Sequence, residues 1–312
     1  MNNKNVSKIL FSIAEYKVKI MMKKMINIKS KDKVSVISSD KELLKLFTKS
    51  LKGINYDIIE TAELRLKLDL ADKSDVILIM LNENVCFNEE VRKKLKEGKK
   101  IVCCPRCNIN KLITGIIEPV KEYNKLITLI SSKLSPNSDF KVVTNDRYTI
   151  IGKLDHFPPF YVGFEFTDQN NFIYIPPGIM GVPVIPESVN GTFMIDGFVQ
   201  DYGPVIYPII LTIENGLLVK FKTNNKNKKI LEIMKNLKDL PVCELGLGFN
   251  PQTKTSTDIS ESESEYGIVD LGFGENKHIG GPISGNIHFD ITTIRPTLFI
   301  DNRIILKNKI FA

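Results

Sequence analysis

The sequence predicts a two-domain protein of mixed α/β class, with a parallel α/β sheet domain followed by a mainly antiparallel, β-rich domain. Short apolar runs alternate with amphipathic segments from residue 33 to about 135, which is typical of a parallel sheet covered by helices. After residue 137, glycine and proline become frequent, and apolar and polar residues alternate between N-G and D-N turns. A length of 312 residues also suits two domains. We therefore expect domains at residues 1–137 and 138–312.

The composition is that of a globular chain with a substantial core. Hydrophobic residues make up 43% of the sequence, and the mean hydropathy is −0.05. No apolar run approaches the roughly 18 residues that a membrane-spanning helix needs, and the first residues lack a small-residue cleavage site. We therefore expect no membrane span and a cytoplasmic location.

The net charge of +7 is confined to the N-terminal segment. Residues 1–33 hold nine lysines against Glu15 and Asp32, so the rest of the chain is neutral overall. This distribution argues against a nucleic-acid-binding face on the body of the protein. Apolar residues from Val6 to Met21 recur close to helical spacing. We expect a basic amphipathic helix that packs on its own domain, the alternative being contact with anionic lipid or a partner.

The first domain reads as alternating strands and helices. Helical patterns cover residues 40–53, 63–73, 88–98 and 120–134, and strand patterns cover residues 33–38, 56–60, 75–81 and 99–105. The order is Rossmann-like, but the turn after the first strand, "VISSDKE", contains no glycine. The sequence therefore does not support a Rossmann-type dinucleotide site, and this domain is interpreted as a scaffold.

The second domain shows the period-two pattern of antiparallel strands. Its alternating segments are residues 175–197, 208–221 and 297–311, and a helix is expected at residues 227–239. The polar run "KTSTDISESESE", residues 254–265, is interpreted as a solvated loop near the mouth of a site.

The cysteines do not form a convincing metal or disulfide pattern. Cys103, Cys104 and Cys107 lie in "CCPRC", but zinc would need a second ligand pair at suitable spacing, and the sequence has none. We expect thiols rather than disulfides, with Cys103 and Cys104 acting as small buried hydrophobes.

A candidate metal site lies in the second domain. In "NIHFD", His288 and Asp290 are two residues apart on a predicted strand and therefore point to the same side. Glu244 in "CELGLGFNP" and Asp270 in "VDLGFGEN" lie beside glycines that permit close backbone approach. Imidazole nitrogen combined with carboxylate oxygen suits zinc, iron(II), manganese or cobalt. The alternative is a set of turn-capping carboxylates with a half-buried histidine.

Five sequence blocks carry a resemblance to a known family. The segments "PPGIMGVPVIPESVNGTFMIDG", "YPIILTIENGLLVKF", "CELGLGFNP", "GIVDLGFGENKHIGG" and "GNIHFDITTIRPTLFIDNRII" resemble, in this order, the aminopeptidase T family of metallopeptidases and its relatives. Those relatives include iron-dependent dihydroxypyridine ring-cleaving dioxygenases. The resemblance covers residues 176–305 well and the rest of the chain weakly. It implies an ancestral metal site and a homodimer.

The resemblance assigns site residues position by position. It implies that His288 and Asp290 match the family's His-x-Asp pair and that Glu244 matches the glutamate of its E-L-G-x-G-x-N block. Asp270 stands where the peptidases have a histidine, and Ile179 stands where they have a glutamate in a P-x-G-E block. An isoleucine side chain cannot bind a cation, so the second of two metal sites would be lost.

His278 adds a further candidate ligand. With His288 and Asp290 it could complete a facial triad of two histidines and one carboxylate, although its place in the glycine turn "HIGG" does not fix its direction.

Three classes of function remain open on this basis. The first is metal-dependent hydrolysis of a peptide or amide bond by an aminopeptidase-like enzyme with zinc, cobalt or manganese, possibly at a single-metal site, and this is favoured. The second is ring cleavage of a small aromatic by a mononuclear iron(II) dioxygenase. The third is a non-catalytic binding or assembly protein, which the loss of the glutamate at Ile179 would favour. The sequence does not identify the substrate.

Overall fold

The protein is described by a computed structural model that covers residues 3–61, 68–82, 88–168 and 170–312, with side chains from Ser7 onward. These residues form two compact units, each of which takes in two separate segments of the chain. One unit comprises Met1–Asn124 and Val162–Pro177, and the other comprises Lys125–Tyr161 and Gly178–Ala312.

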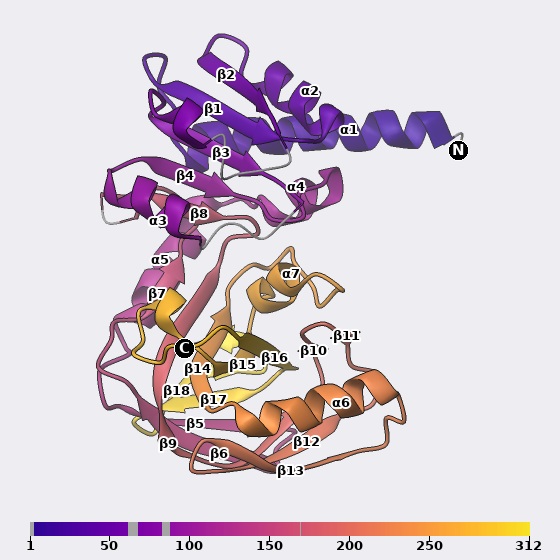
Figure 1. Cartoon of the computed structure of the whole chain (residues 1–312), viewed down its shortest axis with the longest axis vertical. Coiled ribbons are helices and arrows are strands. Elements are labelled where there is room, and N and C mark those ends of the chain that lie inside the picture. The colour runs from indigo at the N-terminus through magenta and orange to yellow at the C-terminus, as the bar shows by residue number, and fades with distance from the viewer. Residues whose placement is uncertain (1–2, 62–67, 83–87, 169) are drawn as a thin grey trace. The chain divides into compact units, whose positions relative to one another are not determined.

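The first unit contains a parallel five-stranded sheet with the strand order β2-β1-β3-β4-β8 (Figure 1). The four strands predicted in the N-terminal domain are confirmed. β8 lies beyond residue 137, within the range that the sequence assigned to the second domain, and nevertheless pairs in parallel with β4 through Cys103 and Tyr174. The strands are β1 (Lys33–Ser38), β2 (Asn55–Glu60), β3 (Val76–Met80), β4 (Lys100–Cys103) and β8 (Phe172–Tyr174).

Helices accompany this sheet, and the expected basic N-terminal helix is present. That helix contacts α2 and α4, and Ala14 and Val18 on its inner face are fully buried. α2 begins where the Asp40 carboxylate accepts hydrogen bonds from two backbone amides of its first turn. The helical elements are α1 (Asn3–Ile20), the π-helix η1 (Met21–Met25), α2 (Lys41–Ser50), the 3-10 helix η2 (Leu68–Ala71), α3 (Glu89–Lys96) and α4 (Ile109–Gly115). α5 (Val120–Ser131) begins in the first unit and continues into the second, whose first residue is Lys125.

The sequence did not predict α4, and two expectations fall partly outside the described residues. The helix expected at residues 63–73 is described only from Leu68, and Cys86 lies in a segment that the structure does not describe. Cys103 is disulfide-bonded, so the expectation of thiols throughout is wrong for this residue. Cys104, Cys107 and Cys243 are free and buried, as expected of small hydrophobes.

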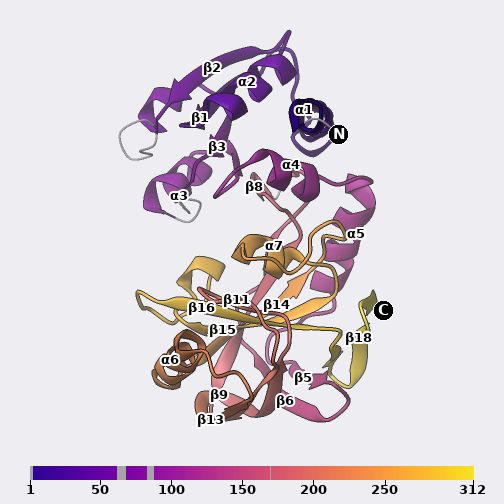
Figure 2. The same ribbon diagram turned by 90° about the vertical axis from the view of Figure 1, so that its right-hand side faces the viewer.

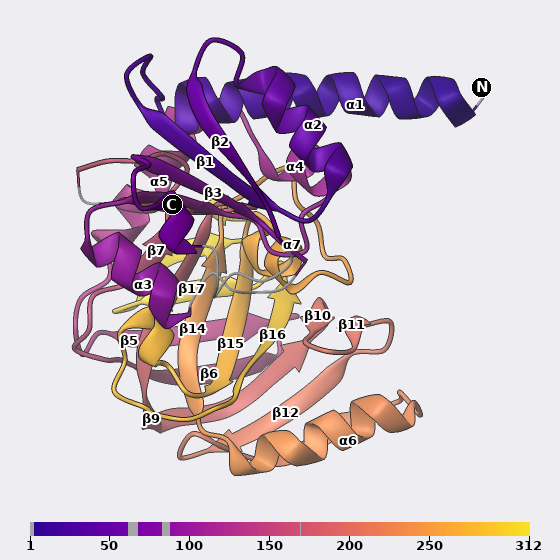
Figure 3. The ribbon, with the colours of Figure 1, turned by 45° about the horizontal axis from the view of Figure 1, so that its top comes forward.

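The second unit is built on an extended antiparallel sheet, which confirms the predicted β-rich character (Figure 3). Its central path runs β11-β10-β16-β15-β14-β9-β6-β5-β17-β18-β19, with β12 and β7 also paired to β9 and β13 paired to β12. β9 is the longest strand, and it connects the two parts of the sheet because it pairs with both β14 and β6.

The strands of this unit are joined by turns, by longer loops and by short helices. They are β5 (Asp139–Thr144), β6 (Tyr148–Leu154), β7 (Phe160–Val162), β9 (Ile179–Ile195), β10 (Phe198–Val199), β11 (Gly203–Pro204), β12 (Ile209–Glu214), β13 (Leu217–Thr223), β14 (Val242–Gly248), β15 (Ile268–Gly274), β16 (His288–Ile294), β17 (Thr297–Ile300), β18 (Arg303–Lys307) and β19 (Ile310–Phe311).

Helical elements also lie between the strands of the second unit. They are α6 (Lys228–Asn236), η3 (Leu237–Asp239), α7 (Ile259–Ser264) and η4 (Lys277–Ile279). α6 and η3 confirm the helix predicted at residues 227–239. α7 contacts β14, β15 and β16 and lies on one side of these strands (Figure 2).

The segment that contains α7 corrects the interpretation of residues 254–265 as a solvated loop. Ser260 and Ser262 are fully buried, and the Ser262 hydroxyl donates to the backbone oxygens of Ser256 and Asp258. The Asp258 carboxylate caps the helix by accepting from the Ser260 amide. Internal hydrogen bonds therefore replace water around a run that looks hydrophilic in the sequence.

Among the described residues, no helix is long and apolar enough to cross a membrane.

Candidate metal centre

The candidate residues lie on one face of three neighbouring strands. β14 pairs with β15, and β15 pairs with β16, so residues directly opposite one another share a face of the sheet. The register sets Glu244 opposite Gly272 and Gly272 opposite Asp290. Two residues further along β15, Gly274 lies opposite His288. Residues two apart share a face, so Asp270 belongs to the same surface. Period-two patterning thus places carboxylates and an imidazole on a common platform.

Glycines give these side chains the space they occupy. A Cβ atom at Gly181 would lie 2.2 Å from Glu244 Oε1, and one at Gly246 would lie 2.8 Å from Asp270 Oδ2. A Cβ atom at Gly272 would lie 2.8 Å from His288 Cε1. None of these three glycines has a positive φ, so space rather than backbone conformation requires them.

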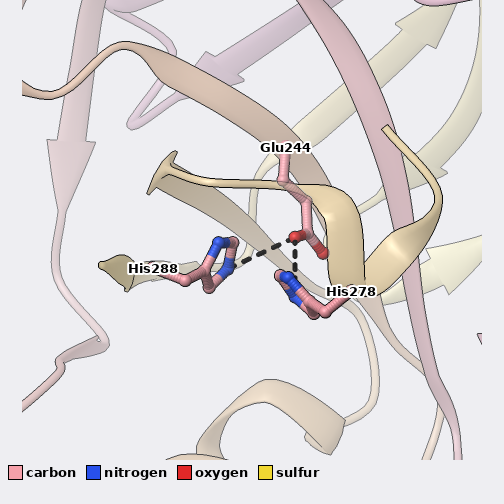
Figure 4. Close-up of side chains that lie close together, drawn as sticks. All are labelled: Glu244, His278 and His288. Carbon is pink, nitrogen blue, oxygen red and sulfur yellow. Dashed lines mark ion pairs between the residues drawn. The ribbon is translucent and has the colours of Figure 1, made fainter. Parts of the chain in front are cut away.

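Glu244, His278 and His288 present their ligand atoms to one another (Figure 4). Glu244 Oε2 lies 3.3 Å from His288 Nε2 and 3.8 Å from His278 Nε2. The two imidazole rings meet edge to face, with their centroids 4.3 Å apart. Although Glu244 is only 5% exposed, its Oε2 atom accepts no hydrogen bond from the described part of the chain. A cation between the three groups would satisfy this buried oxygen.

Glu275 orients both imidazoles through their other ring nitrogens. His288 Nδ1 donates to the backbone oxygen of Glu275 over 2.6 Å, and His278 Nδ1 lies 3.0 Å from Glu275 Oε1. A histidine whose Nδ1 donates in this way offers Nε2 to a metal ion. Carbonyl and carboxylate partners at this position are the usual supports of metal-binding histidines.

Asn276 anchors the loop that carries His278. Its side chain is fully buried, donates to the backbone oxygen of Cys243 over 3.0 Å and accepts from the Ile283 amide over 2.8 Å. These bonds tie the loop to β14 beside Glu244. The glycine turn that followed His278 in the sequence left its direction open, and the structure places this histidine inward, with 16% of its side chain exposed.

Burial and mutual charge set the ionisation of the three groups. Burial, opposed by the charge of His288, raises the pKa of Glu244 to about 7. Burial and the charge of His288 lower the pKa of His278. Burial alone would lower the pKa of His288, but the charge and hydrogen bond of Asp290 outweigh it and hold that pKa well above its usual range. A metal ion bound at His288 must therefore displace a proton.

Asp290 contacts His288 of this centre and also belongs to a neighbouring group of three carboxylates. Asp290 Oδ1 is 2.8 Å from His288 Nε2, and the Asp290 amide donates to Gln200 Oε1 over 3.0 Å. Asp290 also belongs to a group with Glu263 and Asp270, whose ligand atoms lie within 4.8 Å of one another. Burial and repulsion from Asp290 raise the pKa of both Glu263 and Asp270 well above the usual range.

The structure distributes the five sequence candidates over two groups. It brings His278 together with Glu244 and His288, and it places Asp270 and Asp290 in the acidic group. Sequence reasoning missed Glu263, because the Ser-Glu alternation of its segment resembled a solvated loop. It also missed Glu275 and Asn276, although both directly precede His278 in "GENKHIGG".

Ile179 lies on the same face of the sheet as Glu244. Ile179 pairs with Gly248 in the ladder between β9 and β14. Gly248 and Glu244 are an even number of residues apart on β14, so both lie on the face that Ile179 shares. The sequence resemblance implies that a hydrocarbon side chain stands here in place of a glutamate of the peptidases. This position of Ile179 is compatible with that expectation, which stays a prediction.

Two solved structures share the fold over nearly the whole chain. The 2,5-dihydroxypyridine dioxygenase from Pseudomonas putida KT2440 matches with a TM-score of 0.75 and 16% identity, covering 97% of each chain. Wild-type AmpT from Thermus thermophilus matches with a TM-score of 0.61 and 11% identity, covering 96% of this chain and 99% of the other. No protein-family model matches the sequence. No curated protein matches it either. At these identities the likeness establishes a common fold.

Proposed function

We propose that the chain is a mononuclear metalloenzyme in which Glu244, His278 and His288 bind iron(II), and that it oxygenates a small aromatic substrate. The observation that supports this proposal most strongly is the ligand set itself. Two histidines and one carboxylate that converge on one side leave open coordination positions, which is the arrangement used by non-haem iron(II) oxygenases. The dioxygenase with the same fold has a higher TM-score than AmpT, which points in the same direction.

The donors fit a bound divalent metal ion. Glu244 Oε2 is buried without a hydrogen-bond donor among the described residues, and the Nδ1 atoms of both histidines are engaged by Glu275. When bound, iron(II) would supply one-electron chemistry towards dioxygen. Glu275 holds both histidines, and Gln200 Nε2 donates to the backbone oxygen of His288. Asp290 Oδ1 is positioned to accept the proton that His288 Nε2 releases when metal binds.

Metal-dependent hydrolysis of a peptide or amide bond is the second candidate. The fold shared with AmpT favours it, and so does the acidic group, because Glu263 and Asp290 are carboxyl groups of the kind that serve as general bases. The position of Ile179 on the face of Glu244 counts against a second ion at the place implied by the peptidase resemblance. The experiment therefore has to distinguish a small aromatic substrate from a peptide substrate.

The test compares two reactions on defined metal forms of the purified protein. Protein loaded anaerobically with iron(II) is assayed for oxygen uptake with 2,5-dihydroxypyridine, and zinc-loaded protein is assayed for cleavage of aminoacyl arylamides. We expect oxygen uptake that depends on iron and falls at least about a hundredfold in His278→Ala. The matched control is His156→Ala, which removes a histidine whose side chain is 74% exposed. Brisk arylamide cleavage without oxygen uptake would replace this proposal with the hydrolase.

A further inference from the structure

α1 carries an outer stripe of apolar side chains in addition to the inner face that packs on its own unit. The outer stripe consists of Ile9, Ile13 and Tyr16, which are 51%, 39% and 60% exposed. Residues three and four apart on a helix share one face, so these three side chains are neighbours. Together with Lys8 and Ser12 they line one shallow hollow of the surface. The outer stripe is therefore a continuous apolar patch rather than a set of scattered side chains.

Packing within the first unit does not explain why the outer stripe is apolar. The inner face of α1 serves that packing, because Ala14 and Val18 are fully buried and the helix contacts α2 and α4. Figure 1 and Figure 3 show the N-terminal end of α1 extending beyond the other elements of the first unit. A contiguous apolar patch that a protein keeps on its surface marks a site of interaction.

The outer stripe lies in the most basic part of the chain. Residues 1–33 hold nine lysines and two acidic residues, which gives this segment the whole net charge of +7. Lys8 and Lys19, at the two ends of the outer stripe, are both exposed. The acidic residue of α1, Glu15, already pairs with Lys19 and Lys49. The surroundings of the outer stripe are therefore positive, and the surface that complements them is apolar and anionic.

We propose that the outer face of α1 binds the surface of a membrane that contains anionic lipid. A basic amphipathic helix lies in the plane of such a surface, with its bulky apolar side chains at the boundary of the acyl chains and its lysines among the phosphate groups. A membrane surface receives a projecting helix without a matching groove. A second copy of α1 would bring like charges together, and nucleic-acid phosphates offer no apolar surface to the outer stripe. The proposal does not depend on which reaction the histidine centre catalyses.

Co-sedimentation of the full-length protein with lipid vesicles tests the proposal. One set of vesicles is phosphatidylcholine alone, and the other contains about 30% phosphatidylglycerol. We expect binding to the anionic vesicles only, weakened at least about tenfold when the salt concentration rises from about 0.05 M to about 0.5 M. The double variant Ile9→Gln with Ile13→Gln should bind at least about tenfold more weakly, because it removes apolar surface that the membrane buries. Lys8→Glu should weaken binding at least about fivefold, because it reverses a charge at the lipid surface.

Matched controls change the same types of residue elsewhere in the first unit. Leu70→Gln replaces an apolar side chain of η2 that is 63% exposed, and Lys96→Glu reverses an exposed lysine of α3. Both should bind the anionic vesicles as the native protein does. Thermal melts of all these variants should match that of the native protein, because substitutions of exposed side chains have small effects on stability.

Three results would overturn the proposal. The first is native protein that does not bind the anionic vesicles at millimolar lipid concentration, and the second is a double variant of Ile9 and Ile13 that binds them as the native protein does. The third is a native dimer, measured by sedimentation velocity without lipid, that the same double variant dissociates. That result would show that a second copy of the chain covers the outer stripe.

Discussion

On the strands that carry the site, three candidate ligand side chains each lie over a glycine of a neighbouring strand. Gly181, Gly246 and Gly272 each lie where a Cβ atom would collide with a candidate ligand, although none of them needs a left-handed backbone. The absence of a side chain at these positions lets Glu244, Asp270 and His288 lie flat against the sheet instead of turning to solvent. We infer that these glycines support the site without touching a ligand ion themselves.

Gly181→Ala and Gly246→Ala form a pair of variants that should affect zinc binding at the histidine centre to different extents. The Cβ atom of Gly181→Ala would displace the Glu244 carboxylate, whose Oε1 lies 2.2 Å from it, so we expect zinc affinity to fall at least about tenfold. The nearest atoms to the Cβ atom of Gly246→Ala belong to Asp270, at 2.8 Å, which is not one of the three proposed ligands, so zinc affinity should fall less in this variant. Isothermal titration with zinc measures both effects. Equal losses of zinc affinity in the two variants would show a general disturbance of the sheet rather than support of Glu244 by the space at Gly181.

Part of the site could be predicted from residues and part could not. His288 and Asp290 share a strand face because of period-two geometry, which a sequence displays directly. The inward direction of His278 depends on Asn276, whose hydrogen bonds reach β14 across more than thirty residues of chain. Glu263 lies in a run that has the composition of a solvated loop, and only the folded structure shows that its Oε1 atom is buried.

α7 and the strands beneath it show how one short helix brings a carboxyl group to a sheet. A helix of this length is not stable by itself, so its position depends on tertiary contacts. Glu265, just after the helix, binds Lys309 and accepts from both the amide and the hydroxyl of Thr255. This carboxylate thus ties α7 to the turn between β18 and β19.

The Glu265 contacts predict a pH-dependent contribution to stability. Burial alone would raise the pKa of Glu265, but the hydrogen bonds from Lys309 and Thr255 outweigh it and lower that pKa below its ordinary value. A carboxyl whose folded-state pKa is lowered stabilises the protein above its unfolded pKa and loses this contribution as the pH falls through the folded value. Glu265→Gln should therefore reduce the free energy of unfolding by about 2 kcal/mol at pH 7. The difference from the native protein should shrink below pH 4.5.

Urea denaturation at neutral and acidic pH measures this difference. Lys153 and Asp139 provide a control, because they form an ion pair in the same unit with both side chains largely exposed, and Asp139→Asn should have little effect at either pH. A penalty for Glu265→Gln that is the same at pH 3.5 and pH 7 would contradict the assignment of its stabilising role to the ionised carboxylate.

At the scale of the whole molecule, the sequence predicted the two kinds of sheet correctly. Alternating apolar runs and amphipathic helices indicated the parallel sheet, and N-G and D-N turns indicated the antiparallel one. The pairing of β8 with β4 could not be predicted, because three residues between two antiparallel segments carry no signal of a parallel partner far back in the chain. The homodimer implied by the family resemblance and the cytoplasmic location stay predictions.

The central claim is that Glu244, His278 and His288 hold one transition-metal ion. Anomalous diffraction at the zinc edge, from crystals of protein loaded with one equivalent of zinc, tests it most directly. We predict a single strong peak between the three side chains, at about 2.0–2.2 Å from Glu244 and from the Nε2 atoms of His278 and His288. A peak located elsewhere, or no peak at this position in crystals whose protein carries its full equivalent of zinc, would contradict the claim.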